Sequence, residues 1–132
     1  MHSCTTPEEA ILLLEDAYRK KDIDAAVAAK DFQIEARLLL ERIRREKNEP
    51  AVAPSLIHQT AHVLELSFRD HHARKGFPDM TGVVSTFPTK EEVEPGICAV
   101  TELCTWPDGE SVTQKILVAK TERGWKVLNP QR

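Results

Sequence analysis

The last third of the chain constrains the fold most, because it predicts an antiparallel meander. Residues 97–106 and 110–120 are strand-like runs, and Pro107-Asp108-Gly109 separates them. Proline fixes φ at the first turn position, aspartate bonds the local backbone, and glycine accepts a positive φ. A second turn at residues 122–124 leads into a last strand at residues 125–128. Mostly helical sequence precedes these strands, so we predict an α+β fold in one domain, residues 1–132.

Helix signals fill most of the first 76 residues. Thr6-Pro7-Glu8-Glu9 forms a capping box at the start of the first helix, and Asp22 and Asp31 can cap helices over residues 23–30 and 32–47. A fourth helix opens at residue 54 or 55 and ends before Gly76. The predicted apolar stripes of the three longer helices are Ala10, Leu13, Leu14, Ala17 and Tyr18; Phe32, Ala36, Leu39, Leu40 and Ile43; and Ile57, Ala61, Leu64 and Phe68.

A short strand is expected at residues 82–87, followed by an acidic connector at residues 88–96. Thr89 and Glu92 could cap one helical turn in that connector. The three-residue loop at 107–109 then sets the register of the meander, pairing Trp106 with Glu110 and Glu102 with Gln114. Glu102 and Gln114 therefore lie side by side on a sheet face that is otherwise apolar.

Those two residues, with Trp106, are the best candidates for polar groups in a ligand pocket. A carboxyl group on an apolar face has a raised pKa, because desolvation disfavours its charge. The alternative is a cross-strand hydrogen bond of structural importance only. The sequence leaves both interpretations open.

Charge and composition exclude several classes of protein. A formal net charge of −3 does not predict nucleic-acid binding. The longest aliphatic runs, at residues 11–14 and 38–40, are far too short to cross a membrane, and the N-terminus has no signal-peptide pattern. Three cysteines without metal-ligand spacing favour reduced thiols and a cytoplasmic location.

No metal or cofactor is predicted. His58 and His62 are spaced i, i+4 on a helix, which suits a metal face. However, Gln59 stands where a water-activating glutamate would be, and no third ligand is evident. A structural or surface role is the simpler interpretation of both histidines.

Several motifs together resemble the nuclear transport factor 2-like superfamily. They are Thr6-Pro7-Glu8-Glu9 and Asp22-Ile23-Asp24-Ala25-Ala26 near the start, and Trp106-Pro107-Asp108-Gly109 and Gly124-Trp125-Lys126-Val127 near the end. The resemblance implies a cone of helices against a curved antiparallel sheet. Within the superfamily, the helix that ends in Gly76-Phe77-Pro78-Asp79 before the sheet makes the chain most similar to the nuclear transport factor 2 fold immunity proteins.

That resemblance implies a non-enzymatic, cytoplasmic bacterial protein that binds and neutralises a cognate toxin. The isomerases of the superfamily carry a tyrosine one turn before the position of Tyr18 and an aspartate on a strand after the second helix. Here Leu14 and the helical stretch 32–47 occupy those places, so no catalytic residue is predicted. Enolisation needs both a carboxylate and an acidic donor at one carbonyl, and the sequence offers neither at the matching positions.

Two other functions remain open at this point. One is a small-ligand-binding protein, or a cyclase- or isomerase-like enzyme, that uses the cone interior around Glu102 and Gln114. The other is a homodimer formed through the outer sheet face. A sealed apolar interior would favour the immunity protein, whereas an open cavity would favour the ligand. For toxin binding, the candidate charges that steer association are Glu91, Glu92, Glu94, Asp108 and Glu110.

Overall fold

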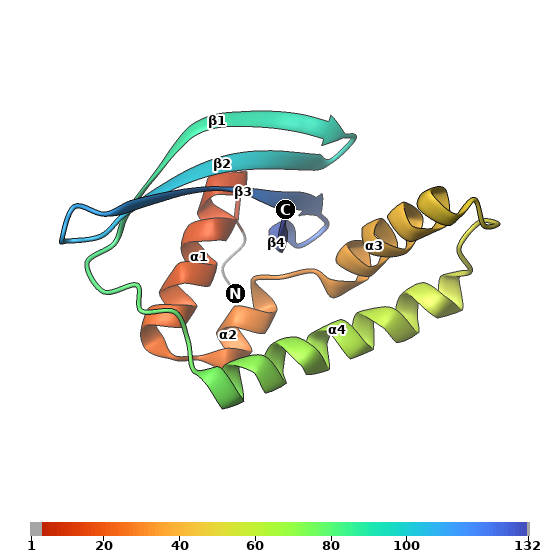
Figure 1. Cartoon of the computed structure of the whole chain (residues 1–132), viewed down its shortest axis with the longest axis horizontal. Coiled ribbons are helices and arrows are strands. Elements are labelled where there is room, and N and C mark those ends of the chain that lie inside the picture. Colours follow the sequence, from red (N-terminus) through yellow and green to blue (C-terminus); the bar gives the residue numbers. More distant parts are fainter. Residues whose placement is uncertain (1–3, 132) are drawn as a thin grey trace.

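Four helices pack against a four-stranded antiparallel sheet in the computed structural model, which confirms the α+β prediction (Figure 1). The structure describes residues 4–131, with side chains described for residues 4–128. The elements follow one another as α1 (Pro7–Lys20), α2 (Ile23–Ala28), α3 (Phe32–Lys47), α4 (Pro54–Lys75), β1 (Val84–Glu94), β2 (Ile97–Thr105), β3 (Ser111–Thr121) and β4 (Gly124–Gln131). The strands lie in sequence order across an open sheet.

The helix starts are those that the capping residues predict. The side chains of Thr6, Asp22 and Asp31 accept hydrogen bonds from backbone N–H groups three residues later, at 3.2, 3.1 and 3.0 Å. Each bond satisfies a donor that the first turn of a helix leaves without a partner. The fourth helix has Pro54 at its first position and no side-chain cap.

The main core lies between α1 and the inner face of the sheet. Ile11 of α1 packs with Val100, Ile116, Val118 and Val127, which face it from three neighbouring strands. Leu13 and Leu14 are only partly buried, so the α1 face that meets the sheet is centred on Ala10 and Ile11. Trp125 is half-buried at the edge of this core, and its backbone N–H donates to the Cys4 carbonyl at 3.1 Å.

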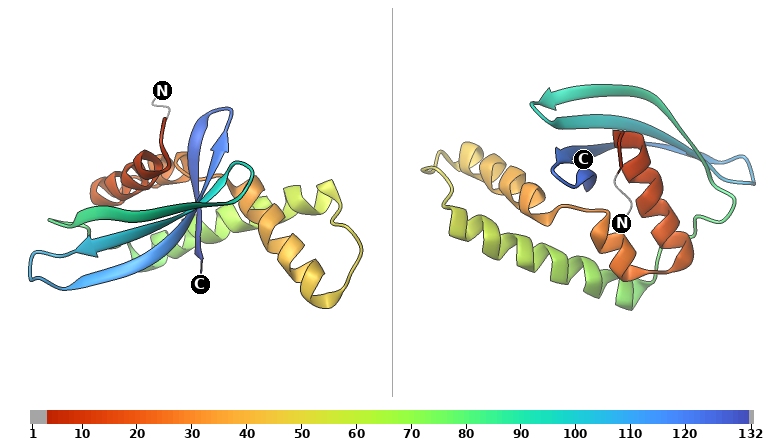
Figure 2. Two further views of the ribbon diagram at one scale, coloured as in Figure 1. Left: turned by 90° about the horizontal axis from the view of Figure 1, so that it is seen from above. Right: turned by 180° about the vertical axis from the view of Figure 1, so that it is seen from behind.

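A second core joins α3 to α4. Phe32, Ala36 and Ala61 are buried there, with Ile57, Leu64 and Phe68 packed around them, which confirms the predicted α4 stripe. The far end of this helical pair extends beyond the sheet (Figures 1 and 2). The C-terminal half of α3 therefore has no fully buried side chain, although Leu39, Leu40 and Ile43 were predicted to face a core.

The acidic connector expected at residues 88–96 is mostly strand. β1 runs from Val84 to Glu94 and pairs with β2 along nearly its whole length. Two features hid it from sequence analysis. Pro88 lies within a register shift between Thr86 and Thr89, and β1 is an edge strand, where charged side chains and proline are tolerated.

The hairpin β2–β3 has the predicted register. Glu102 lies opposite Gln114, and Cys104 opposite Val112. At the loop, the Trp106 N–H donates to the Glu110 carbonyl at 2.8 Å, and Asp108 Oδ1 accepts from the Glu110 N–H at 2.9 Å. Gly109 has a φ of 91°, the left-handed value for which glycine was expected.

The outer sheet face is only partly exposed to solvent. Ser111, Thr113 and Lys115 are exposed there. At the other end of the sheet, Ile34 and Leu38 of α3 cover a small core of Ile97, Ala119 and Leu128. This contact was not predicted. A dimer formed through the outer sheet face could therefore use only the end of the sheet near the β2–β3 loop.

Ile11 and its neighbour Leu12 test the packing of α1. Ile11 is 1 % exposed and Leu12 is 42 % exposed. We expect Ile11→Ala to lower the free energy of unfolding by about 2–5 kcal/mol, because it leaves a cavity in the main core. Leu12→Ala should change it by less than about 0.5 kcal/mol. Urea denaturation of both variants measures this, and equal losses would show that α1 does not bury the face described.

Candidate functional site

The predicted polar pair lies at the centre of the inner sheet face. Gln114 Nε2 donates to Glu102 Oε1 at 3.0 Å, across the register that places the two residues opposite each other. Glu102 is completely buried, and its second oxygen, Oε2, accepts no hydrogen bond from the described residues. An unpaired buried carboxylate oxygen costs free energy, so a proton, a hydrogen-bond donor or a cation beside it would be stabilising.

A second buried carboxyl group, which the sequence analysis missed, reaches this pair from α1. Glu15 is 5 % exposed and accepts a hydrogen bond from Ser85 Oγ of β1 at 3.0 Å. The only signal in the sequence was its position, one helical turn after Ile11 and within the apolar face. A glutamate in a helix is usually exposed, which is why this signal was not used.

Cys104 completes the cluster. One ligand atom each from Glu15, Glu102 and Cys104 lies within 4.8 Å of the others, and all three residues are buried. The Cys104 Sγ atom is also 3.8 Å from Ser85 Oγ. Helix α1 and strand β2 therefore bring three acidic groups together, and Ser85 of β1 contacts two of them.

Burial and mutual repulsion shift the pKa values of these groups. Burial raises the pKa of Glu15 to about 8, assisted by the hydrogen bond and negative charge of Glu102. Burial also acts to raise the pKa of Glu102, but hydrogen bonds from Glu15, Gln114 and Ser85 outweigh it and leave this pKa below its ordinary value. The two carboxyl groups therefore share one proton at neutral pH, as one coupled pair.

The pKa of the Cys104 thiol is raised, like that of Glu15. Burial raises the pKa of Cys104 to about 11; a hydrogen bond from Ser85 opposes this effect, and the negative charges of Glu102 and Glu15 add to it. Without a cation nearby, Cys104 is thus a neutral thiol at physiological pH.

A cavity of about 340 Å³ adjoins this cluster. Its walls are mainly apolar, with Ile11, Leu14, Met80 and Ile116 among them. The polar groups in its lining are Glu15, Tyr18, Lys30, Cys104, Trp106 and Gln114. Val112 also lines the cavity and is 54 % exposed, so the cavity opens toward the loop end of β2–β3.

The three pocket residues named from the sequence have different positions. Gln114 and Trp106 line the cavity, whereas Glu102 lies behind the lining and contacts Gln114. Trp106 Nε1 donates a long hydrogen bond of 3.4 Å to the Asp79 carbonyl, which ties the loop after α4 to the cavity entrance. Burial, with the charge of Glu15, raises the pKa of Tyr18 to about 12, so its phenol stays a hydrogen-bond donor.

Lys30 closes the inner end of the cavity. Its Nζ atom is 3.1 Å from Glu35 Oε1 and lies 5.0 and 4.7 Å from the ring centres of Phe32 and Phe68. Burial lowers the pKa of Lys30, and the charge of Glu35 opposes this. The ion pair and the two rings keep a buried cation tolerable at the junction of helices and sheet.

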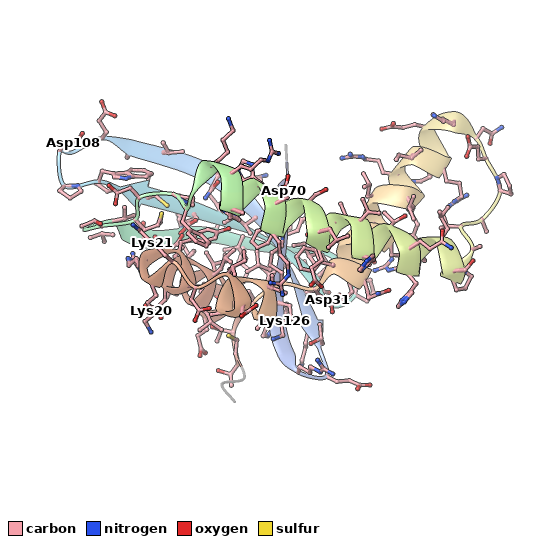
Figure 3. All side chains as sticks on the ribbon, turned by 90° about the horizontal axis from the view of Figure 1, so that it is seen from below. Lys20, Lys21, Asp31, Asp70, Asp108 and Lys126 are labelled. Carbon is pink, nitrogen blue, oxygen red and sulfur yellow. The ribbon has the colours of Figure 1, made fainter. Side chains whose placement is uncertain are left out.

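The five acidic residues proposed to steer a partner do not form one surface. Glu91, Glu92 and Glu94 lie at the end of β1, beside the β1–β2 turn. Asp108 and Glu110 lie at the β2–β3 loop, at the opposite end of the same strands, and Asp108 marks that end in Figure 3. Residues 88–96 were expected to be a connector, but most of them continue β1, which carries its glutamates away from the β2–β3 loop.

His58 and His62 are exposed on a wide, open groove of about 900 Å³ between α3, α4 and the β3–β4 turn. Lys126 and Asp31 lie on the same groove and are close together in Figure 3. His58 Nδ1 is 3.2 Å from Gln33 Nε2. Among the described residues, the three-ligand group found is the buried cluster, and it includes neither histidine.

Comparisons with protein-family models, with curated proteins and with solved structures give no match to this chain. No helix among the described residues has both the length and the apolar character needed to cross a membrane. The site therefore has to be interpreted from its own geometry.

The Glu15–Glu102 pair predicts a specific pH dependence of stability. The folded-state pKa of Glu15, about 8, is above the ordinary glutamate value of 4.5. The proton on this pair therefore stabilises the fold fully below about pH 4.5, and that contribution is lost as pH rises through about 8. Denaturation of wild type from pH 5 to 9 in metal-free buffer should show this decline, and Glu15→Gln should flatten it. An unchanged slope in Glu15→Gln would contradict the shared proton.

Proposed function

We propose that the chain binds a small, mostly apolar molecule in the cavity between α1 and the inner sheet face. The observation that carries this proposal is the cavity itself. Its volume of about 340 Å³, apolar walls and few polar groups are typical of small-molecule sites. Of the hypotheses drawn from the sequence, an open cavity beside Glu102 and Gln114 favours the small ligand over the sealed interior of an immunity protein.

The polar groups indicate what the molecule carries. Tyr18 of α1 is a hydrogen-bond donor on the cavity wall, and Gln114 of β3 also lines the cavity. A ring or chain of roughly ten to fifteen heavy atoms with one carbonyl or hydroxyl group suits such a lining. We propose binding rather than turnover, because Leu14 stands on the wall where the isomerases that the chain resembles carry a tyrosine.

The same features support membership of the nuclear transport factor 2-like superfamily as part of this proposal. The order of helices before a bent antiparallel sheet, with a cavity between them, agrees with that resemblance. A cyclase- or isomerase-like reaction in the cavity would be the enzymatic form of the same proposal.

Two leucines of α1 give a matched test of the cavity. Leu14 lines it, whereas Leu12 is exposed and does not. Acetophenone is a suitable probe, because it combines an aromatic ring with a carbonyl group. The chain has two tryptophans, Trp106 on the cavity and Trp125 outside its lining, so their indole N–H signals in NMR report the position of the probe.

We expect acetophenone to shift the Trp106 signal in wild type and in Leu12→Phe. In Leu14→Phe the added ring fills the cavity, so the apparent Kd should rise by about tenfold or more. A Trp106→Phe variant assigns the two signals. Equal shifts at both tryptophans, or the same Kd in both phenylalanine variants, would show that the cavity is not the binding site.

We propose toxin neutralisation by direct contact as the second candidate function. A row of exposed apolar side chains on α4 favours it: Leu56, Val63 and Leu66 are 45, 59 and 52 % exposed. They point away from the α3–α4 core, on the helical pair that extends beyond the sheet (Figure 2). Large exposed apolar residues near one another often mark a protein-binding surface. In this proposal the protein is a cytoplasmic immunity protein and its partner is a cognate toxin.

Co-expression with a toxin encoded beside the gene tests this second function. We expect Val63→Asp with Leu66→Asp to abolish protection of the cells, because charge at the centre of an interface is strongly unfavourable. Glu102→Gln, a buried change far from that surface, should protect as well as wild type. Protection that survives the α4 changes but requires Glu102 would exclude contact through α4 and point to chemistry in the cavity.

A further inference from the structure

The buried cluster of Glu15, Glu102 and Cys104 has more negative character than its hydrogen bonds can satisfy. Three groups that ionise to anions converge within 4.8 Å, each of them more than nine-tenths buried. Gln114 donates to one oxygen of Glu102, and Ser85 donates to one oxygen of Glu15, each at 3.0 Å. Glu102 Oε2 accepts no hydrogen bond from the described residues. A proton or a metal ion among these groups would remove the cost of this unpaired oxygen.

We propose that Glu15, Glu102 and Cys104 form a binding site for a zinc-like divalent cation at the wall of the cavity. Zinc takes carboxylate oxygens at about 2.0–2.2 Å and thiolate sulfur at about 2.3 Å. Tetrahedral ligands at those distances lie about 3.5 Å apart, so modest side-chain rotations bring these three atoms onto one ion. A proton can satisfy one contact in the cluster, whereas a metal ion satisfies all three.

The chemistry of the ligands selects the type of metal. A thiolate with two carboxylates suits a borderline ion such as Zn²⁺ or Co²⁺. Mg²⁺ and Ca²⁺ prefer six or more oxygen ligands, which this cluster does not offer. Glu15 and Cys104 also line the cavity, so a fourth coordination position would face it. Three protein ligands with one open position are typical of zinc sites that bind an exchangeable water or ligand.

Metal binding exchanges protons for the ion. The Cys104 thiol and the carboxyl pair each lose a proton to solvent, so the cluster passes from one shared proton and a neutral thiol to three anionic ligands around M²⁺. Binding should therefore strengthen as pH rises. Ser85 donates to Glu15 and Gln114 donates to Glu102, and hydrogen bonds of this kind orient the ligands of metal sites.

Cysteine substitutions provide the sharpest test. Cys98 is a matched control for Cys104, because it lies on the same face of β2 and is also buried, but is outside the cluster. Metal-stripped wild type titrated with Co²⁺ should bind one equivalent and show a near-ultraviolet thiolate-to-cobalt charge-transfer band. We expect Cys104→Ser to lose this band and Cys98→Ser to keep it, with folding of each variant checked by circular dichroism.

Two further measurements do not depend on whether Cys104→Ser folds. Calorimetry of Zn²⁺ binding to wild type, in buffers of different ionisation enthalpy, should show release of about two protons near pH 7. Zinc should raise the Tm of wild type, and Glu102→Gln should weaken zinc binding by about tenfold or more. No cobalt band and no zinc binding in wild type, or a band that persists in Cys104→Ser, would overturn the proposal. The cavity proposal is independent, because acetophenone binding is measured in metal-free protein.

Discussion

The packing of α1 across the inner face of the sheet is the contact on which the rest of the structure depends. One face of this helix carries both Ile11 and Glu15. Ile11 packs into the main core, and Glu15 lies beside Glu102 of the inner sheet face. Apolar burial is the main force that holds α1 on the sheet. Because Glu15 lies on the same helix face as Ile11, this packing also places Glu15 beside Glu102. The site is thus a consequence of the same packing that stabilises the domain.

Burial gives the cluster its chemical character. In water, two glutamates and a cysteine at these positions would be two separate anions and a neutral thiol. Inside the protein, desolvation couples the carboxyl groups into one proton-sharing pair and makes Cys104 harder to ionise. This environment favours any positive species that can enter, and the adjoining cavity provides a route to it. The proposed binding of a small molecule and the proposed binding of a metal ion therefore concern one region of the protein.

The helical pair α3–α4 plays a different part. Phe68 of α4 lines the inner end of the cavity together with Lys30, which precedes α3, while Ile34 and Leu38 of α3 cover part of the outer sheet face. The far end of the pair extends beyond the sheet (Figure 1), and α4 carries exposed apolar side chains along its length. The molecule consequently has two separate regions suited to recognition, an enclosed one between α1 and the sheet and an exposed one on α4. The proposed functions divide between them.

The sequence alone determined the features that depend on local chemistry. Capping residues, the Pro107-Asp108-Gly109 loop and strand alternation predicted the helix starts, the α+β class and the contact of Glu102 with Gln114, because each depends on residues near in sequence or joined by a tight turn. Only the tertiary structure decided the features that depend on distant packing. Glu15 meets Glu102 across 87 positions of chain, β1 continues through a proline because it is an edge strand, and the acidic residues of β1 and the β2–β3 loop are separated by the length of the sheet. Local patterns specify periodicity and turns, whereas burial and the approach of remote side chains arise only when helices and sheet pack together.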